Sequence, residues 1–147
     1  MSRIVNTENV GTKRNRLVRA IVLAIRELAK QTKPNSRTKD LAAFMVFALK
    51  AVAETVEETT APWEKRGYWV KADRFRMEWG WVESLNRALR DAVLGEDWGA
   101  VAEQAARVAA KLGSVEISER HRLGTPWVGA WDKLRAEDAS AAQSLKK

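Results

Sequence analysis

The chain has 147 residues, of which 46% are hydrophobic, and a formal net charge of +7 at pH 7. This length suits a single domain with one core, and the hydrophobic content excludes an intrinsically disordered chain. Because the sequence contains no cysteine, disulfides, thiolate metal sites and cysteine nucleophiles are also excluded.

The excess positive charge lies entirely in the N-terminal part of the sequence. Residues 1–40 contain ten basic and three acidic residues, whereas residues 41–147 contain sixteen of each. Localised basic charge is the usual signature of a surface that binds phosphates. If the protein binds a polyanion, we therefore expect the N-terminal third to do so.

The first predicted helix follows an irregular arm over residues 1–12. Over residues 13–31, apolar side chains recur at three- and four-residue steps, which predicts an amphipathic helix capped by Thr12. The opposite face is basic and surrounds Leu23, which we expect to be exposed. This face is either a solvated surface or a site for a polyanion or partner. Its cations are Arg16, Arg19, Arg26 and Lys30.

Ser36 or Thr38 is predicted to cap a second helix, with Asp40 in its first turn interacting with the helix dipole. Its long apolar run predicts burial on most sides but is too short to span a membrane. The helical pattern weakens towards Pro62, and proline is tolerated in a first turn but not in a helix interior. We expect Thr60 to cap a new helix, and a kinked continuation through Pro62 is the alternative.

Three more cations, Lys33, Arg37 and Lys39, surround the start of this second helix. Free backbone N–H groups at a helix start attract anions, and nearby cations strengthen such a site. The simpler interpretation is an exposed loop, which is favoured because such loops are common. Neither flanking helix suits a DNA groove, since both are long and the second is very apolar.

The third helical region is predicted over residues 62–94, with Gly67 and Gly80 as weak points. An alanine-rich fourth helix begins after Asp97 and ends before Gly113. Its small side chains would permit close approach to a neighbouring helix. The predicted core face of the third region consists of Tyr68, Ala72, Phe75, Trp79, Val82, Leu89 and Val93.

Residues 114–147 are expected to form a C-terminal extension with a short helix near residues 126–134 and a frayed tail. Trp127 and Trp131, four residues apart, would anchor this extension. Helices joined by short connections pack as antiparallel neighbours. The sequence therefore predicts an all-α fold, an antiparallel bundle of about four helices over residues 13–113 with the extension packed back on it.

Seven tryptophans are more than one bundle core encloses easily, because each ring is large and carries a polar N–H. Trp69 and Trp81 fall off the predicted core face, and tryptophan is enriched at interface hot spots. Interleaved aromatic and basic residues also occur in surfaces that bind single-stranded nucleic acid, but core and protein interface are favoured here. The predicted protein interface comprises Trp69, Trp81, Trp127 and Trp131.

Signatures of catalysis are scarce. His121 is the only histidine and lies between two arginines, and no nucleotide-binding or hydrolase motif is present. Glu54, Glu57 and Glu58 share a helix face, but carboxylate metal sites in bundles also need histidines from other helices. We predict no catalytic, metal-binding or cofactor-binding residue and no enzyme activity.

The segments EKRGYWVKADRFRMEW and HRLGTPW resemble a family of short bacterial all-helical proteins that has no assigned activity. The resemblance covers most of residues 12–132 and implies a bacterial cytoplasmic protein. It carries over no functional residue.

These observations favour a non-enzymatic helical module that acts by self-association or by binding a protein partner. The alternative is sequence-independent nucleic-acid binding through the basic N-terminal third. We expect no membrane partner, since no apolar run is long enough to span a bilayer. The sequence start lacks the apolar segment of a secretory signal, which favours a cytoplasmic location.

Overall fold

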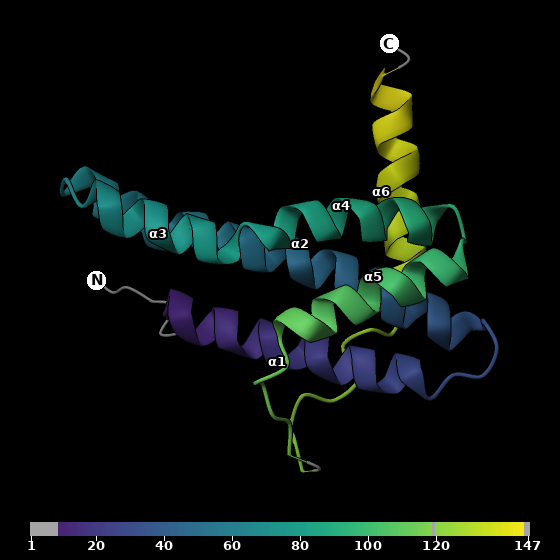
Figure 1. The fold of residues 1–147 in the computed structure, drawn as a ribbon. Coiled ribbons are helices and arrows are strands. Elements are labelled where there is room, and N and C mark those ends of the chain that lie inside the picture. The colour runs from purple at the N-terminus through teal and green to yellow at the C-terminus, as the bar shows by residue number, and fades with distance from the viewer. Residues whose placement is uncertain (1–8, 119, 146–147) are drawn as a thin grey trace, which may run out of the picture.

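The computed structural model describes residues 9–118 and 120–145, and the all-α fold class is confirmed. Within these residues six helices and no strand are found. Figure 1 shows their arrangement. The helices are α1 (Val10–Ala29), α2 (Ser36–Lys65), α3 (Trp69–Trp79), α4 (Trp81–Leu94), α5 (Trp98–Lys111) and α6 (Ala130–Leu145).

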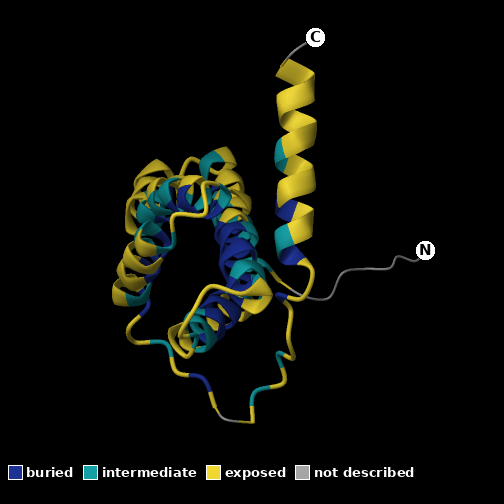
Figure 2. Ribbon diagram, turned by 90° about the vertical axis from the view of Figure 1, so that its right-hand side faces the viewer, coloured by how far each residue is buried: buried dark blue, intermediate teal, exposed yellow. Residues whose placement is uncertain are grey.

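The central element is α2, which packs against α1, α3, α4 and α6. Its apolar run is buried as the sequence predicts, since Leu41, Met45 and Leu49 are inaccessible to solvent. α5 packs chiefly on α4. Figure 2 shows that buried residues line the inner faces of the helices, whereas most of α6 stands away from the body. The bundle thus has one core organised around α2.

The first helix begins earlier than predicted. Asn9 is its N-cap, and the Asn9 side-chain oxygen accepts a hydrogen bond from the backbone N–H of Thr12 at 2.8 Å. Thr12, expected to be the cap, is therefore the residue that is capped. Asparagine is as good an N-cap as threonine or better. The prediction missed Asn9 because the apolar periodicity that was used to place the helix start becomes clear only after residue 13. The remainder of the predicted arm, residues 1–8, lies outside the described residues.

α2 continues through Pro62, so the expected new helix at Thr60 is wrong. The Thr60 hydroxyl donates to the carbonyl of Val56 at 3.0 Å and caps nothing. Proline removes one backbone hydrogen bond, but Pro62 and the residue one turn before it, Glu58, are both exposed, so water satisfies the carbonyl that loses its donor. The helix ends instead before Gly67, whose φ of 81° is a left-handed conformation that glycine adopts without strain.

The third predicted region is divided at both glycines into the end of α2, α3 and α4. Its expected core face is largely correct, because Ala72, Val82, Leu89 and Val93 are buried. Tyr68 is the exception, with 52% of its surface exposed. It lies in the turn before α3, where the helical spacing used in the prediction does not apply.

The C-terminal helix differs from the prediction in both position and length. Residues 126–129 form a turn, and α6 starts at Ala130 and continues to Leu145 in place of a frayed tail. The two carboxylate oxygens of Asp40 accept hydrogen bonds from the backbone N–H groups of Gly129 and Trp131 at 3.2 and 3.0 Å. Asn35, and neither Ser36 nor Thr38, is the N-cap of α2. Asp40 therefore lies beyond the first turn of its own helix, where it was expected, and it caps α6 instead.

Candidate binding surfaces

The basic face of α1 remains on the surface, but the fold modifies it. Arg16, Arg19, Arg26 and Lys30 are all exposed. Leu23, expected to be exposed among them, is buried. The Arg26 guanidinium donates to the carbonyl oxygen of Ile117 at 3.5 Å, which shows that the segment after α5 crosses this face. We infer that this segment covers Leu23.

Several of the predicted polyanion-binding cations have partners within the protein. Glu27 pairs with Lys30 at 2.9 Å and with Arg37 at 3.0 Å. The hydrogen bond from Lys30, together with the nearby arginine charges, holds the pKa of Glu27 below its usual value. Glu27 thus neutralises part of the positive potential that the sequence pattern implies.

Arg37 and Lys39 hold the C-terminal extension in place. The Arg37 guanidinium lies 5.9 Å from the ring centre of Trp127, and the Lys39 ammonium lies 5.5 Å from that of Trp131. Both geometries are cation–π contacts. Lys39 also pairs with Glu96 at 3.1 Å. Arg37 and Lys39 therefore contact the C-terminal extension, and among the residues that the structure describes the fold brings only Arg37 to a cation at the end of α1, since it shares Glu27 with Lys30.

The four tryptophans predicted at a protein interface have different environments. Trp127 is buried, so it packs inside the protein in this structure. Trp131 and Trp81 are half-buried against the core, and Trp81 stacks on Trp79 with ring centres 6.3 Å apart. Only Trp69 is largely exposed, at 60%. Three of these four tryptophans therefore pack within the protein itself, and they need no second protein to cover them.

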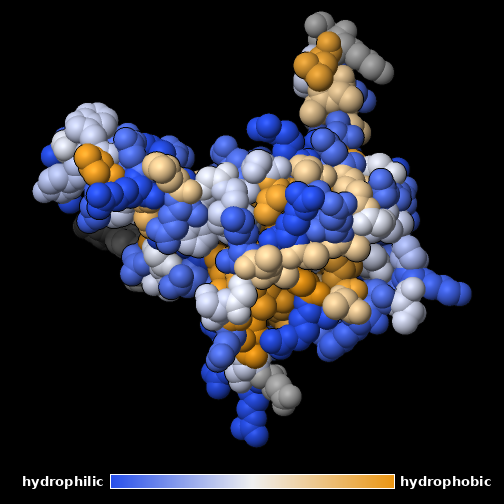
Figure 3. All heavy atoms as spheres, in the orientation of Figure 1, coloured by the Kyte–Doolittle hydropathy of each residue, from blue (hydrophilic) through white to orange (hydrophobic). Residues whose placement is uncertain are grey.

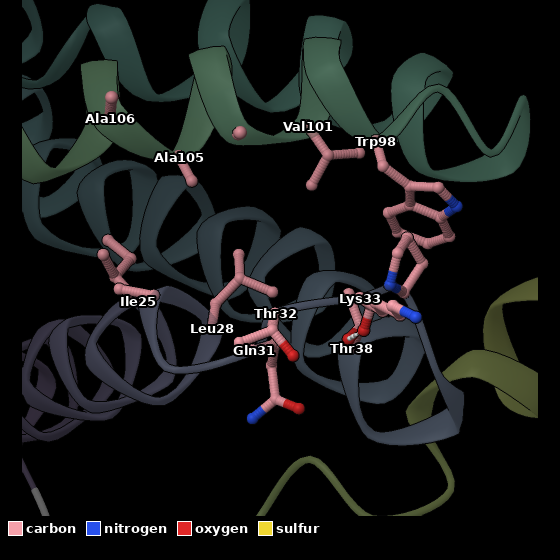
Figure 4. A pocket seen from close by; sticks show the side chains of 13 residues that line it. Ile25, Leu28, Gln31, Thr32, Lys33, Thr38, Trp98, Val101, Ala105 and Ala106 are labelled. Carbon is pink, nitrogen blue, oxygen red and sulfur yellow. Dashed lines mark hydrogen bonds between the residues drawn. The ribbon is translucent and has the colours of Figure 1, made fainter.

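An apolar groove lies between α1 and α5, with a volume of about 400 Å³. Figure 3 shows apolar atoms exposed along this side of the molecule. In Figure 4, Ile25 and Leu28 point from α1 towards α5, and Trp98 closes one end beside Lys33 and Thr38. Sequence analysis missed this groove, because no local pattern shows which helix faces fail to meet. The α5 side chains that line it are Trp98, Val101, Ala102, Ala105 and Ala106.

Arg14 is a second feature that the sequence analysis missed. It is buried where α1 meets α2 and α3, and its guanidinium donates to the Thr59 hydroxyl at 2.9 Å. The same group lies 4.8 Å from the ring centre of Phe75. Burial lowers the pKa of Arg14, yet a guanidinium remains protonated. The sequence did contain a sign of this burial. Arg14 lies seven residues before the buried Ile21, and residues with this spacing share one face of a helix.

The residues considered for catalysis are dispersed. His121 accepts a hydrogen bond at Nδ1 from the backbone N–H of Leu123 at 3.3 Å. Glu57 is bound by Arg76. Over residues 9–118 and 120–145, no three metal-type ligands are grouped to hold an ion.

Comparisons of the chain with protein-family models, with curated proteins and with solved structures found no match. Within the described part of the chain, no helix combines the length and apolar character needed to cross a bilayer.

Proposed function

We propose that the protein is a non-enzymatic interaction module that binds an amphipathic helix of a protein partner in the groove between α1 and α5. The observation that carries this proposal is the apolar lining of that groove, in which Ile25, Leu28 and Trp98 are partly exposed. Helix-in-groove recognition uses apolar side chains spaced along one face of the bound helix. A volume of about 400 Å³ admits a few such side chains.

The composition of α5 favours a helical occupant. Ala102, Ala105 and Ala106 line the groove with methyl groups, so a second helix backbone can approach closely without displacing large side chains. At the rim, Lys33 is exposed and its side chain has no ion pair with the residues that the structure describes. This charge favours a partner helix that carries a carboxylate at one end of its apolar face.

The experiment uses a photo-crosslinking amino acid at Ala106, which lines the groove, and at Ala139, an exposed position on α6. We expect a discrete protein adduct from position 106 and none from position 139 when the protein is irradiated in its native cells. The captured segment, made as a peptide, should then bind the purified protein in a titration. The same adducts from both positions would contradict the proposal.

A matched pair of substitutions on α5 tests whether the groove is responsible. Ala102 lines the groove and Ala110 does not, and both are exposed. Ala102→Arg should weaken peptide binding by about tenfold or more, because it places an unpaired charge among apolar groups. Ala110→Arg should leave binding unchanged. Equal effects of the two changes would reject the groove as the site.

The second candidate function is sequence-independent binding of nucleic acid. Its support is that Arg16, Arg19 and Arg26 stay exposed along α1. The segment after α5 adds two exposed cations, Arg120 and Arg122. Charge of one sign along a helix face is the footprint expected of a surface that contacts phosphates.

A further inference from the structure

The lining of the α1–α5 groove is polar at one end only. Its polar side chains come from the turn after α1 and from the start of α2, and they are Gln31, Thr32, Lys33 and Thr38. The rest of the lining consists of alanine, valine, leucine, isoleucine, proline and tryptophan. Trp98 closes the groove at its polar end, beside Lys33 and Thr38 (Figure 4). The groove therefore combines a long apolar part with a short polar end, as a site for an amphipathic ligand requires.

Lys33 supplies the only charge in the part of the lining that the structure describes. Its ammonium and the Thr32 hydroxyl are exposed, and neither has a hydrogen-bond partner among the described residues. Three carboxylates adjoin lining residues in sequence. Glu27 and Glu103 are bound by basic side chains, and Asp97 caps α5. The polar end thus offers one unpaired positive charge and one hydroxyl, and a carboxylate can accept hydrogen bonds from both.

The dimensions of the groove suit a single chain of medium length. Along α5 the lining extends from Trp98 to Ala106, which is about 12 Å at 1.5 Å per residue. The volume of about 400 Å³ lies within the range of small-molecule sites. Ile25, Leu28 and Trp98 are partly exposed, so an acyl chain along the groove would remove apolar surface from water.

We propose that the groove also binds an amphipathic carboxylate of the medium-chain fatty-acid type, which competes with the partner helix. The carboxylate lies at Lys33 and Thr32, and the acyl chain follows α5 from Trp98 to Ala106. The partner helix would use the same apolar lining and place its own carboxylate at Lys33. The regulatory effect of the ligand therefore rests on the proposed function, whereas its binding does not.

The charge of the lining favours a carboxylate over other head groups. An uncharged chain would leave the Lys33 ammonium without a partner, and a cationic chain would be repelled by it. A doubly charged phosphate would bring one charge more than the single lysine of the lining balances, beside a wall of methyl groups where an unpaired charge is costly.

Isothermal titration calorimetry of the full chain at pH 7 tests the head group, with decanoate and decylamine below their micelle-forming concentrations. We expect wild type to bind decanoate at least about fivefold more tightly than decylamine, as an exposed ion pair allows. Lys33→Glu should reverse this preference. Lys111→Glu is the matched control, because it makes the same charge change at an exposed position outside the lining. It should keep the wild-type preference.

A second pair of variants tests the apolar part of the groove. Ala102 lines the groove and Ala110 does not, and both are exposed. Ala102→Trp should weaken decanoate binding by at least about tenfold, because the indole fills the space of the acyl chain. Ala110→Trp should leave binding unchanged. Far-ultraviolet circular dichroism verifies that every variant keeps its helix content.

Competition is measured with the photo-crosslinking amino acid at Ala106, in an extract of the native cells. Saturating decanoate should reduce the adduct by at least about fivefold, and decylamine at the same concentration by less than about twofold, since the tighter ligand excludes the helix by mass action. An unchanged adduct in the presence of bound decanoate would overturn the competition. An absence of adduct under every condition would contradict the proposed function, and calorimetry would still decide whether the ligand binds.

Three calorimetric outcomes would overturn the ligand site. The first is that decanoate does not bind wild type. The second is that decanoate and decylamine bind equally, or that Lys33→Glu and Lys111→Glu have equal effects. The third is that Ala102→Trp and Ala110→Trp weaken decanoate binding to the same extent.

Discussion

The carboxylate of Asp40 accepts a hydrogen bond from the backbone N–H of Trp131 at 3.0 Å and so links two helices that are remote in sequence. Its second oxygen accepts from the N–H of Gly129 at 3.2 Å. Glycine has no side chain that could cap the helix that follows it. Asp40 therefore supplies from α2 the cap that the local sequence of α6 lacks.

Replacing Asp40 should loosen the C-terminal helix. Asp40→Ala leaves two backbone N–H groups without their acceptors, and we expect a loss of about 1–2 kcal/mol in the free energy of unfolding. Urea denaturation measures this loss, and limited proteolysis within residues 130–145 should become faster. As a control, Asp91→Ala removes an exposed carboxylate from α4 and should change stability by less than about 0.5 kcal/mol. A variant as stable and as protease-resistant as wild type would show that the cap is dispensable.

Arg14 provides a comparison between a buried and an exposed cation on one helix. Arg14→Ala removes the hydrogen bond to Thr59 and the contact with Phe75, and we expect it to cost about 2–4 kcal/mol in the free energy of unfolding. Arg19→Ala, at an exposed position, should cost less than about 0.5 kcal/mol. Thermal and chemical denaturation measure both changes. Equal free energies of unfolding for the two variants would show that Arg14 does not stabilise the packing of α1 against α2 and α3.

The α2–α3 hairpin should lose stability in acid. Arg76 binds Glu64 at 2.7 Å, and this bond holds the pKa of Glu64 below its ordinary value of 4.5. A carboxyl whose folded pKa is depressed contributes stability that is complete above its unfolded pKa and is lost as pH falls through the lower, folded pKa. We therefore expect the contribution to be present at neutral pH and to disappear below about pH 4.5.

Denaturation of the wild-type chain and of Glu64→Gln, measured between pH 7 and pH 3, tests this pH dependence. The two proteins should differ most at neutral pH and converge in acid, because wild-type Glu64 becomes protonated there. A stability difference that stays constant over the whole range would mean that Glu64 contributes through packing and not through its charge.

The basic face of α1 distinguishes the two candidate functions. If it binds duplex DNA, the logarithm of the affinity should fall with the logarithm of salt concentration, with a slope of about −0.9 per phosphate contacted. Reversal of Arg16, Arg19, Arg26 and Lys30 to glutamate should then abolish DNA binding. The same variant should bind the groove peptide within about threefold of wild type if the groove proposal holds. Electrophoretic shifts and peptide titrations separate the outcomes.

Two tryptophans should respond oppositely to truncation. Trp127 is buried under Arg37, and Trp127→Ala should cost about 3–5 kcal/mol in the free energy of unfolding because it leaves a cavity. Trp69 is exposed on α3, and Trp69→Ala should cost less than about 0.5 kcal/mol in chemical denaturation. A stable Trp127→Ala variant would mean that the C-terminal extension adds little to the fold.

The parts of the fold that sequence predicted well are those fixed by local periodicity. The apolar run at the start of α2 needs no knowledge of its neighbours, because nearly every residue in it must be buried. The α4 residues Val82, Leu89 and Val93 were placed correctly for the same reason, since helical spacing alone puts them on one face.

The errors arose where a distant segment decides the environment of a residue. Leu23 is surrounded by cations in its own helix and is buried nevertheless. Pro62 ends a helix by local rules but is tolerated on the solvent side of α2. Neither position carries a local signal of its tertiary environment, and the same is true of the groove, which exists because two apolar helix faces do not fully meet.

Among the residues that the structure describes, the last hydrogen bond between α6 and the body is the one that the Arg90 guanidinium donates to the Asp138 carboxylate at 3.3 Å. The residues after Asp138, up to Leu145, are exposed and helical, and at 1.5 Å per residue they extend about 10 Å beyond this attachment. This exposed part of α6 separates Leu145 from the helical bundle. A label attached at Leu145 would therefore lie about 10 Å from the last hydrogen bond to the body when this segment is helical.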